Sequence, residues 1–187
     1  MRYSSLFKKI FNIAKYFAYI LEIFIFYTIQ RVPNSLIQFL FNIRPIYLIP
    51  ITLVITIFEG KTVGLIFSII VGILLDLEFS FNLGFYTIVL GILAFVVSTF
   101  FKKNIKINFF TVNILVLSSV IVVFLLEFLF FFVFKGYKDI FYALINFYLP
   151  QLGFTALTIP LFYFFNKTIS GASVISDVQG ASDENKE

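Results

Sequence analysis

The sequence predicts an all-α integral membrane bundle of about six transmembrane helices, with both termini in the cytoplasm. Apolar residues make up 60% of the chain and charged residues only 13%, whereas soluble domains contain about 45–50% and about 25% of these classes. Too few polar side chains are therefore available to cover a soluble globule. Long uncharged segments recur along the chain, and Lys and Arg are unequally distributed between them.

Uncharged segments define the predicted spans, since crossing a bilayer takes about 20 mostly apolar residues. Two shorter uncharged segments, Pro45–Phe58 and residues 62–75, become spans when flanking residues extend them and Arg44 snorkels to the interface. Three uncharged segments are long enough by themselves: Phe79–Phe101, Ile107–Leu126 and Ile140–Asn166. With Ile13–Ile29 added, the predicted helices lie near residues 13–30, 43–58, 61–77, 83–101, 108–134 and 140–165.

The segments outside these spans separate a membrane domain from a polar tail. The first apolar stretch contains Lys15 and Glu22 and lacks a small-residue cleavage pattern, so we expect a retained span rather than a signal peptide. Residues Val32–Ile43 are moderately apolar and are expected to lie along the membrane interface as a short helix. After Lys167 the composition becomes polar. We therefore predict a multi-pass transmembrane domain over residues 1–167 and a disordered polar cytoplasmic tail over residues 168–187.

The orientation follows from the Lys and Arg residues near the span ends, which are enriched on the cytoplasmic side. A cytoplasmic N-terminus places ten of them inside and four outside. The inner set is Arg2, Lys8, Lys9, Lys15, Lys61, Lys102, Lys103, Lys106, Lys167 and Lys186, and the outer set is Arg31, Arg44, Lys135 and Lys138. Both termini are therefore expected inside.

Small residues form a stripe on the third predicted span. They recur every four residues, a spacing that keeps them on one helix face, and the stripe ends in a carboxylate: Gly60, Gly64, Ser68, Gly72 and Asp76. A looser stripe follows on the next span: Gly84, Thr87, Gly91, Ala94 and Ser98. Small residues let neighbouring backbones approach closely in lipid. Two interpretations stay open, namely packing within the bundle and a groove for a partner's helix.

Charged residues inside spans are costly and are candidates for function. Asp76 and Arg44 are both expected near the outer surface, where the two can pair. Glu22 and Glu127 are isolated from basic residues in the sequence, so each is expected to be protonated, paired across helices or facing a polar cavity. A proton or cation pathway is one hypothesis that these two glutamates raise.

Several classes of chemistry are excluded or disfavoured. The chain contains no Cys, His or Trp, which removes thiol nucleophiles, histidine-ligated metals and the usual general base near neutral pH. Asp76 has no second Asp within a span, and Gly60-Lys61-Thr62 lacks the preceding glycine of a phosphate-binding loop. We therefore expect no enzyme activity, no metal and no cofactor. The net charge of +4 suits an anionic membrane surface better than nucleic acid.

The stretch from Arg44 to Gly91 resembles the rod shape-determining protein MreD family. The shared features are Arg44-Pro45 opening an apolar span, Glu59-Gly60, Gly64, Gly72, Leu74-Leu75-Asp76-Leu77, and Asn82-Leu83-Gly84 opening the next span. The chain departs from many relatives at Ile46, where these carry an acidic or amide residue. The last two spans are similar only in hydrophobic spacing.

This resemblance implies a small non-catalytic component of the bacterial cell-elongation machinery in the cytoplasmic membrane. Such proteins associate with MreC, a single-span protein, and through it with MreB filaments, RodA and a class B penicillin-binding protein. The implied role is to organise lateral peptidoglycan synthesis and so maintain rod shape. The Gly60–Asp76 face, with Gly84, Arg44 and Pro45 nearby, is then the expected structural centre and partner surface.

An alternative from another class also fits the layout. Six short helices with a basic cytoplasmic side resemble the substrate-binding S component of energy-coupling-factor vitamin transporters. Such a protein holds a small molecule in an outward-facing cavity and joins a transporter module. Tyr and Phe would then have to replace the missing Trp and His side chains.

Overall fold

The computed structural model describes residues 2–32, 44–78, 84–104, 108–133 and 140–184. All the regular elements in this part of the chain are helical, which confirms the all-α class there. Two short π-helical segments, η1 and η2, interrupt the α-helices. The elements are α1 (Arg2–Arg31), α3 (Leu48–Glu59), α4 (Lys61–Glu78), α5 (Phe85–Asn104), α6 (Phe109–Phe128), η1 (Leu129–Val133), α7 (Ile140–Ala143), η2 (Leu144–Tyr148) and α8 (Leu149–Glu184).

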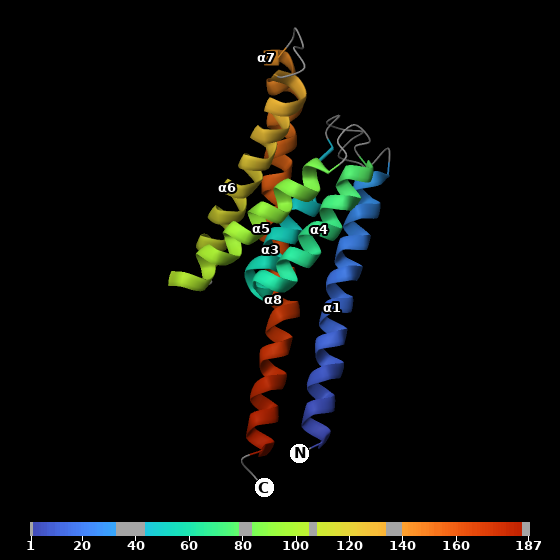
Figure 1. Cartoon of the computed structure of the whole chain (residues 1–187), viewed down its shortest axis with the longest axis vertical. Helices are drawn as coiled ribbons and strands as arrows, with labels where there is room; N and C mark the ends of the chain where they lie inside the picture. Colours follow the sequence, from blue (N-terminus) through green and yellow to red (C-terminus); the bar gives the residue numbers. More distant parts are fainter. Residues whose placement is uncertain (1, 33–43, 79–83, 105–107, 134–139, 185–187) are drawn as a thin grey trace.

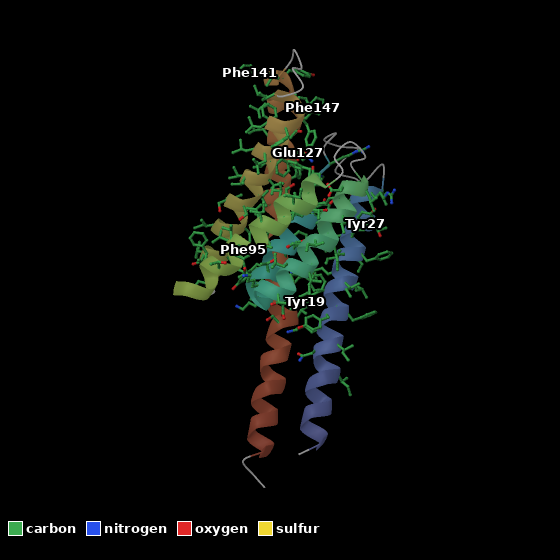
Figure 2. The ribbon with its side chains drawn as sticks, in the orientation of Figure 1. Tyr19, Tyr27, Phe95, Glu127, Phe141 and Phe147 are labelled. Atoms are coloured by element: carbon green, nitrogen blue, oxygen red, sulfur yellow. The ribbon has the colours of Figure 1, made fainter. Side chains whose placement is uncertain are left out.

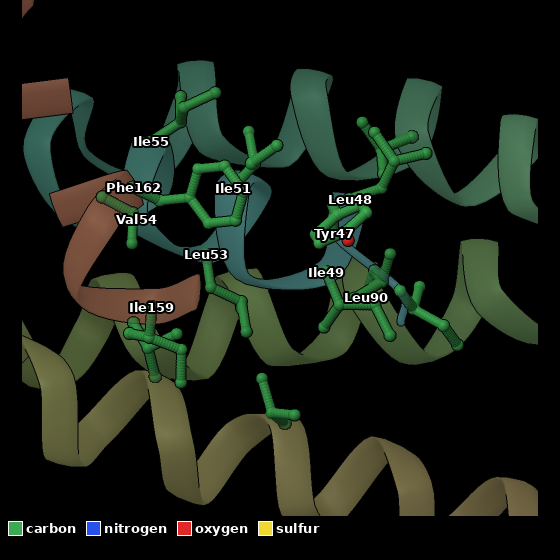
Figure 3. Packing of buried hydrophobic residues seen from close by; sticks show 14 of the residues in the cluster. Tyr47, Leu48, Ile49, Ile51, Leu53, Val54, Ile55, Leu90, Ile159 and Phe162 are labelled. Carbon is green, nitrogen blue, oxygen red and sulfur yellow. The ribbon is translucent and has the colours of Figure 1, made fainter. Parts of the chain in front are cut away.

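Helix α3 is the centre of the bundle. All residues from Leu48 to Ile57 are buried, and α1, α4, α5, α6 and α8 all pack against this helix. Figure 3 shows Leu90 of α5 and Phe162 of α8 beside its apolar side chains. The segment is rich in β-branched residues, which are mediocre helix formers in water. Its helicity therefore depends on the apolar surroundings, where every backbone polar group must be satisfied within the segment.

Two threonines of α3 are compatible with this interior because their hydroxyl groups bond within the helix. Thr52 Oγ1 donates to Leu48 O at 2.7 Å, and Thr56 Oγ1 donates to Thr52 O at 2.8 Å. Pro50 lies in the first turn, where a missing N–H leaves no helical hydrogen bond unmade. A fully enclosed helix can thus contain polar residues without unpaired groups.

The outer faces of the other described helices are strongly apolar. Exposed Ile, Leu, Val and Phe side chains occur on each of them, and Phe110 of α6 and Leu157 of α8 are each 75% exposed. Soluble proteins rarely expose apolar surface so continuously. Three helical segments are long and apolar enough to cross a membrane: Asn12–Arg31, Phe109–Val133 and Ile140–Gly171. Leu48–Glu59 and Phe85–Phe100 are shorter apolar helices, so the count of six spans stays a prediction.

The N-terminal end of α1 and the C-terminal end of α8 lie at the same end of the molecule (Figure 1). Their cytoplasmic location stays a prediction. Helix α8 continues to Glu184, through the polar segment after Lys167, and the disorder of residues 168–187 stays a prediction. The domain boundary at residue 167 is untested. Apart from Val32, the predicted interfacial helix Val32–Ile43 lies outside the described residues.

The last predicted span is continuous through Pro150. The π-helical turn η2 immediately precedes α8, in which Pro150 is the second residue. A proline ring clashes with the carbonyl group four residues earlier in a regular α-helix. The wider π-helical turn at this point relieves that clash, so the chain stays helical from Ile140 onward.

Gly60 ends α3 in a backbone conformation that favours glycine. Its φ is +82° and its ψ is −171°, a region that is essentially restricted to glycine. Its N–H donates to Thr56 O at 3.0 Å, and its carbonyl accepts from Gly64 N at 2.9 Å. One residue thus closes α3 and begins α4, which turns the two helices into a tight hairpin.

Replacing Gly60 with Ala should therefore lower the free energy of unfolding by about 1–3 kcal/mol through backbone strain, although no atom lies within 4 Å of the added Cβ. Gly91→Ala is the matched control, because that position is also open but helical, and the change is expected to be neutral or stabilising by about 0.5–1 kcal/mol. Unfolding in detergent micelles measures both. Equal effects would contradict the assignment of strain to Gly60.

Candidate functional site

The small residues of α4 face other helices of the same chain. A Cβ atom at Gly64 would lie 2.6 Å from Thr56 Cγ2 of α3, and one at Gly72 would lie 2.8 Å from the backbone nitrogen of Thr87 in α5. Ser68, between them, is fully buried. Of the two interpretations of this stripe, the geometry at Gly64 and Gly72 is that of packing within the bundle. The groups that fill the space at these two positions belong to α3 and α5 of the same chain.

Asp76 binds the N-terminus of α5. One carboxylate oxygen accepts from Tyr86 N at 2.9 Å, and the other accepts from Thr87 N at 3.0 Å and Thr87 Oγ1 at 2.6 Å. These amides belong to the first turn of α5, where helical N–H groups have no partner within the helix. An anion is also favoured there by the helix dipole. The buried carboxylate is therefore satisfied by the neighbouring helix.

The turn into α5 depends on Gly84. Its φ is +89°, and its carbonyl accepts from Ile88 N at 3.1 Å. Gly72, Asp76 and Gly84 thus act at one place: Gly72 lets α5 approach, Asp76 binds its first turn, and Gly84 directs the chain into it. We name this group of contacts the α4–α5 clamp. Gly60 is in the α3–α4 turn, and Gly91, farther along α5, opens to the outside with no atom within 4 Å of a Cβ position.

Arg44 and Pro45 lead into α3. Pro45 is buried and Arg44 is exposed, and the following backbone N–H, that of Ile46, donates to Thr155 Oγ1 of α8 at 3.1 Å. We expected that Arg44 and Asp76 can pair. Asp76 instead accepts the three hydrogen bonds from α5, while the charge of Arg44 acts on Glu78.

Gln30 joins three helices at this end of the bundle. Its Nε2 donates to Glu78 Oε2 at 2.9 Å, and its Oε1 accepts from Tyr47 N at 3.0 Å. Burial raises the pKa of the Glu78 carboxyl, whereas the hydrogen bond from Gln30 and the positive charges of Arg31 and Arg44 lower it. The ends of α1 and α4 and the start of α3 are thereby held together.

Glu59 holds the opposite end of the hairpin. Its two carboxylate oxygens bind Tyr19 Oη at 2.7 Å and Lys15 Nζ at 2.7 Å, both from α1. The Tyr19 ring also packs edge-on against Phe67 of α4. The sequence by itself places Glu59 only beside Gly60 in the MreD-like segment. The signal that could have identified its partners is the helical spacing of Lys15 and Tyr19, which puts both on one face of α1.

The two glutamates that we singled out inside spans are both buried, and their surroundings differ. Glu127 of α6 interacts with the hydroxyl groups of Tyr86 and Tyr148. Glu22 of α1 accepts a hydrogen bond from Asn166 of α8 at 3.1 Å. Tyr19, one turn before Glu22, and Glu127 lie toward opposite ends of the bundle (Figure 2). The structure thus places these acids in two separate polar contacts, neither of which sequence analysis assigned.

In the described residues, no group of three or more His, Cys, Asp or Glu side chains comes together that could hold a metal ion. The carboxylates of Asp76, Glu59 and Glu78 instead bind groups of neighbouring helices. The hydrogen bonds of the α4–α5 clamp hold these two helices in a fixed register.

No protein-family model matches the chain, and no curated protein or solved structure matches it. The family resemblance therefore rests on the residues of segment 44–91 alone.

The clamp predicts a loss of stability on a change at either Asp76 or Thr87. Asp76→Asn leaves at least one buried N–H group of α5 without an acceptor, and Thr87→Val removes only the hydroxyl donor. We expect losses of about 1–3 kcal/mol in unfolding free energy for the first and about 1.5 kcal/mol or more for the second, because its acceptor is charged. Thr99→Val is the control on the same helix, since Thr99 is exposed and donates only to Phe95 O. If Thr87→Val is as neutral as Thr99→Val, the clamp is not stabilising.

Gly72→Ala should also be damaging, because the added Cβ meets the backbone of α5 and no side chain can move away. Overpacking of this kind typically costs about 1–3 kcal/mol and sometimes more, and the displaced helix also weakens the Asp76 hydrogen bonds. Gly153→Ala, at an open position of α8, is the control. Thermal unfolding of both variants in detergent provides the comparison, and a wild-type midpoint for Gly72→Ala would disprove the close approach.

Proposed function

We propose that the chain is a non-catalytic multi-pass scaffold of the bacterial cell-elongation machinery in the cytoplasmic membrane. The observation that carries the proposal is the convergence of the MreD-like residues on one structural unit. Gly60, Gly64, Gly72, Asp76 and Gly84 all act in the hairpins that enclose α3. A motif that builds a rigid bundle and leaves apolar outer faces supports a role in holding other membrane proteins.

The partner surface then lies outside the glycine stripe of α4. Among the glycines singled out in the sequence, Gly91 is the one on a helix whose Cβ position opens outward. Ile88, Ile92 and Phe95 beside it on α5 are exposed by 63%, 60% and 46%. A single apolar helix can approach closely at a glycine flanked by large apolar side chains. We assign this face of α5 to the single span of MreC.

Further partners are reached through this contact. MreC would connect the scaffold to MreB filaments, RodA and a class B penicillin-binding protein, and the complex would organise lateral peptidoglycan synthesis. Six spans with both termini in the cytoplasm suit this arrangement, since ten of the fourteen Lys and Arg residues then face the anionic inner leaflet.

Substitution at Gly91 tests the proposed contact. We expect Gly91→Leu to fold, because the position is open, and to reduce co-purification of MreC at least about tenfold, because the backbones are forced apart. Gly153→Leu is the matched control at another open helical glycine, and it should retain MreC. The measurement is affinity purification from detergent-solubilised membranes, with the unfolding midpoint of each variant recorded in parallel.

The outcomes separate the surface from the function. Wild-type protein that fails to capture MreC would refute the cell-elongation role, and capture of a transporter module with a bound vitamin would favour the S-component alternative. Equal capture by wild-type and Gly91→Leu protein would keep the role and reject this face of α5.

A further inference from the structure

A buried polar contact joins α1 to α8. Asn166 is fully buried and Glu22 is 6% exposed. The Nδ2 atom of Asn166 donates to Glu22 Oε1 at 3.1 Å and to Phe162 O, in the preceding turn of α8, at 2.9 Å. The helices that carry the two ends of the chain therefore meet through a carboxyl–amide contact inside the apolar bundle.

The orientation of the Asn166 amide is fixed by this arrangement. The Phe162 carbonyl only accepts hydrogen bonds, so the NH₂ group must face it and the oxygen must point elsewhere. In the described structure, Asn166 Oδ1 and Glu22 Oε2 are then buried acceptors with no donor. Leaving an unpaired acceptor on both the carboxyl and the amide is unfavourable in an apolar interior. A single hydrogen atom on Glu22 would supply the donor that this contact lacks.

The charged groups around Glu22 are engaged elsewhere. On α1 itself, Lys15 forms its ion pair with Glu59 of α3, and the Tyr19 hydroxyl donates to the same glutamate. On α8, Lys167 lies over the Tyr163 ring, and on α4, Lys61 lies over the Phe95 ring. In the described part of the chain, no cation is thus assigned to Glu22. An unpaired buried carboxylate would be costly, which a bound proton avoids.

We propose that Glu22 is a proton-binding site, in which the protonated carboxyl donates to Asn166 Oδ1 while accepting from Asn166 Nδ2. The proton comes from bulk water and adds to the carboxylate without any other bond changing. The product is a neutral acid–amide pair with two hydrogen bonds between α1 and α8. Glu127 also has a buried Oε2 atom without a hydrogen-bond partner in the described structure, but its neighbours are the hydroxyl groups of Tyr86 and Tyr148.

Infrared spectroscopy of the full-length protein in detergent tests the proton directly. A protonated carboxyl has a C=O stretching band distinct from that of a carboxylate. At neutral pH, Glu22→Gln should remove a protonated-carboxyl band that the wild type shows, and Glu127→Gln should retain that band. An unchanged spectrum in Glu22→Gln would overturn the proposal, because it would mean that Glu22 is ionised.

Stability against pH gives a second readout. Gln has the shape of a protonated Glu and can form the same two-bond pair with Asn166, so Glu22→Gln should fold. Between about pH 5 and pH 9 the wild type should lose stability as the folded state gives up the Glu22 proton. Its unfolding midpoint relative to Glu22→Gln should fall by at least about 2–4 °C across this range.

Asn166→Leu supplies the reference for the pair. At low pH the protonated Glu22 carboxyl and the Gln side chain of the Glu22→Gln variant both form the two-bond pair with the amide, so Asn166→Leu should lower the unfolding midpoint by the same amount in the wild-type and Glu22→Gln backgrounds. If Glu22→Gln is less stable than wild type at every pH, or if its profile runs parallel to that of wild type, the proton-binding site is refuted.

Discussion

The bundle depends most on the contact between the Asp76 carboxylate and the first turn of α5. A helix N-terminus inside an apolar bundle carries N–H groups that water cannot reach, and Asp76 accepts from two of them as well as from the Thr87 hydroxyl. The contact requires the two helices to be very close, which Gly72 allows. The charge of Asp76, the N–H groups at the start of α5 and the missing side chain at Gly72 are therefore all required by the same contact. Because α3 is enclosed by α4, α5 and their neighbours, an error at this contact would open the centre of the molecule.

Buried polar groups elsewhere follow the same requirement. Thr52 and Thr56 donate to carbonyls of their own helix, Glu59 binds two donors from α1, and Gln30 bridges α4 and the start of α3. In lipid the apolar surfaces give helices little reason to associate specifically. The polar contacts therefore fix which helices are neighbours and in which register, while the Ile-, Val- and Phe-rich surfaces provide close packing without choosing a partner.

The sequence allowed the helical class and the approximate bounds of the helices to be predicted, because uncharged length is a direct requirement of the bilayer. It also indicated that Gly64, Gly72 and Asp76 share one face of a helix, because a spacing of four residues does so by geometry. It did not reveal which helix occupies that face. Contacts such as Asp76 with Thr87, Glu59 with Lys15 and Glu22 with Asn166 depend on how separate helices are arranged, and residue spacing contains no such information.

The contrast between Gly72 and Gly91 supports the position that we propose for the partner surface. Both are small residues on membrane-type helices, and sequence alone treats them alike. The backbone of α5 fills the space beside Gly72, so the missing side chain there allows α4 and α5 to pack closely. The space beside Gly91 is open and lies between large exposed apolar side chains. A partner that used the Gly64–Gly72 face would have to displace α3 or α5 and break the Asp76 contact. Binding to the outward face of α5 leaves that contact intact. The partner surface that we propose therefore lies outside the central stripe of the motif, whose residues serve the packing of the bundle itself.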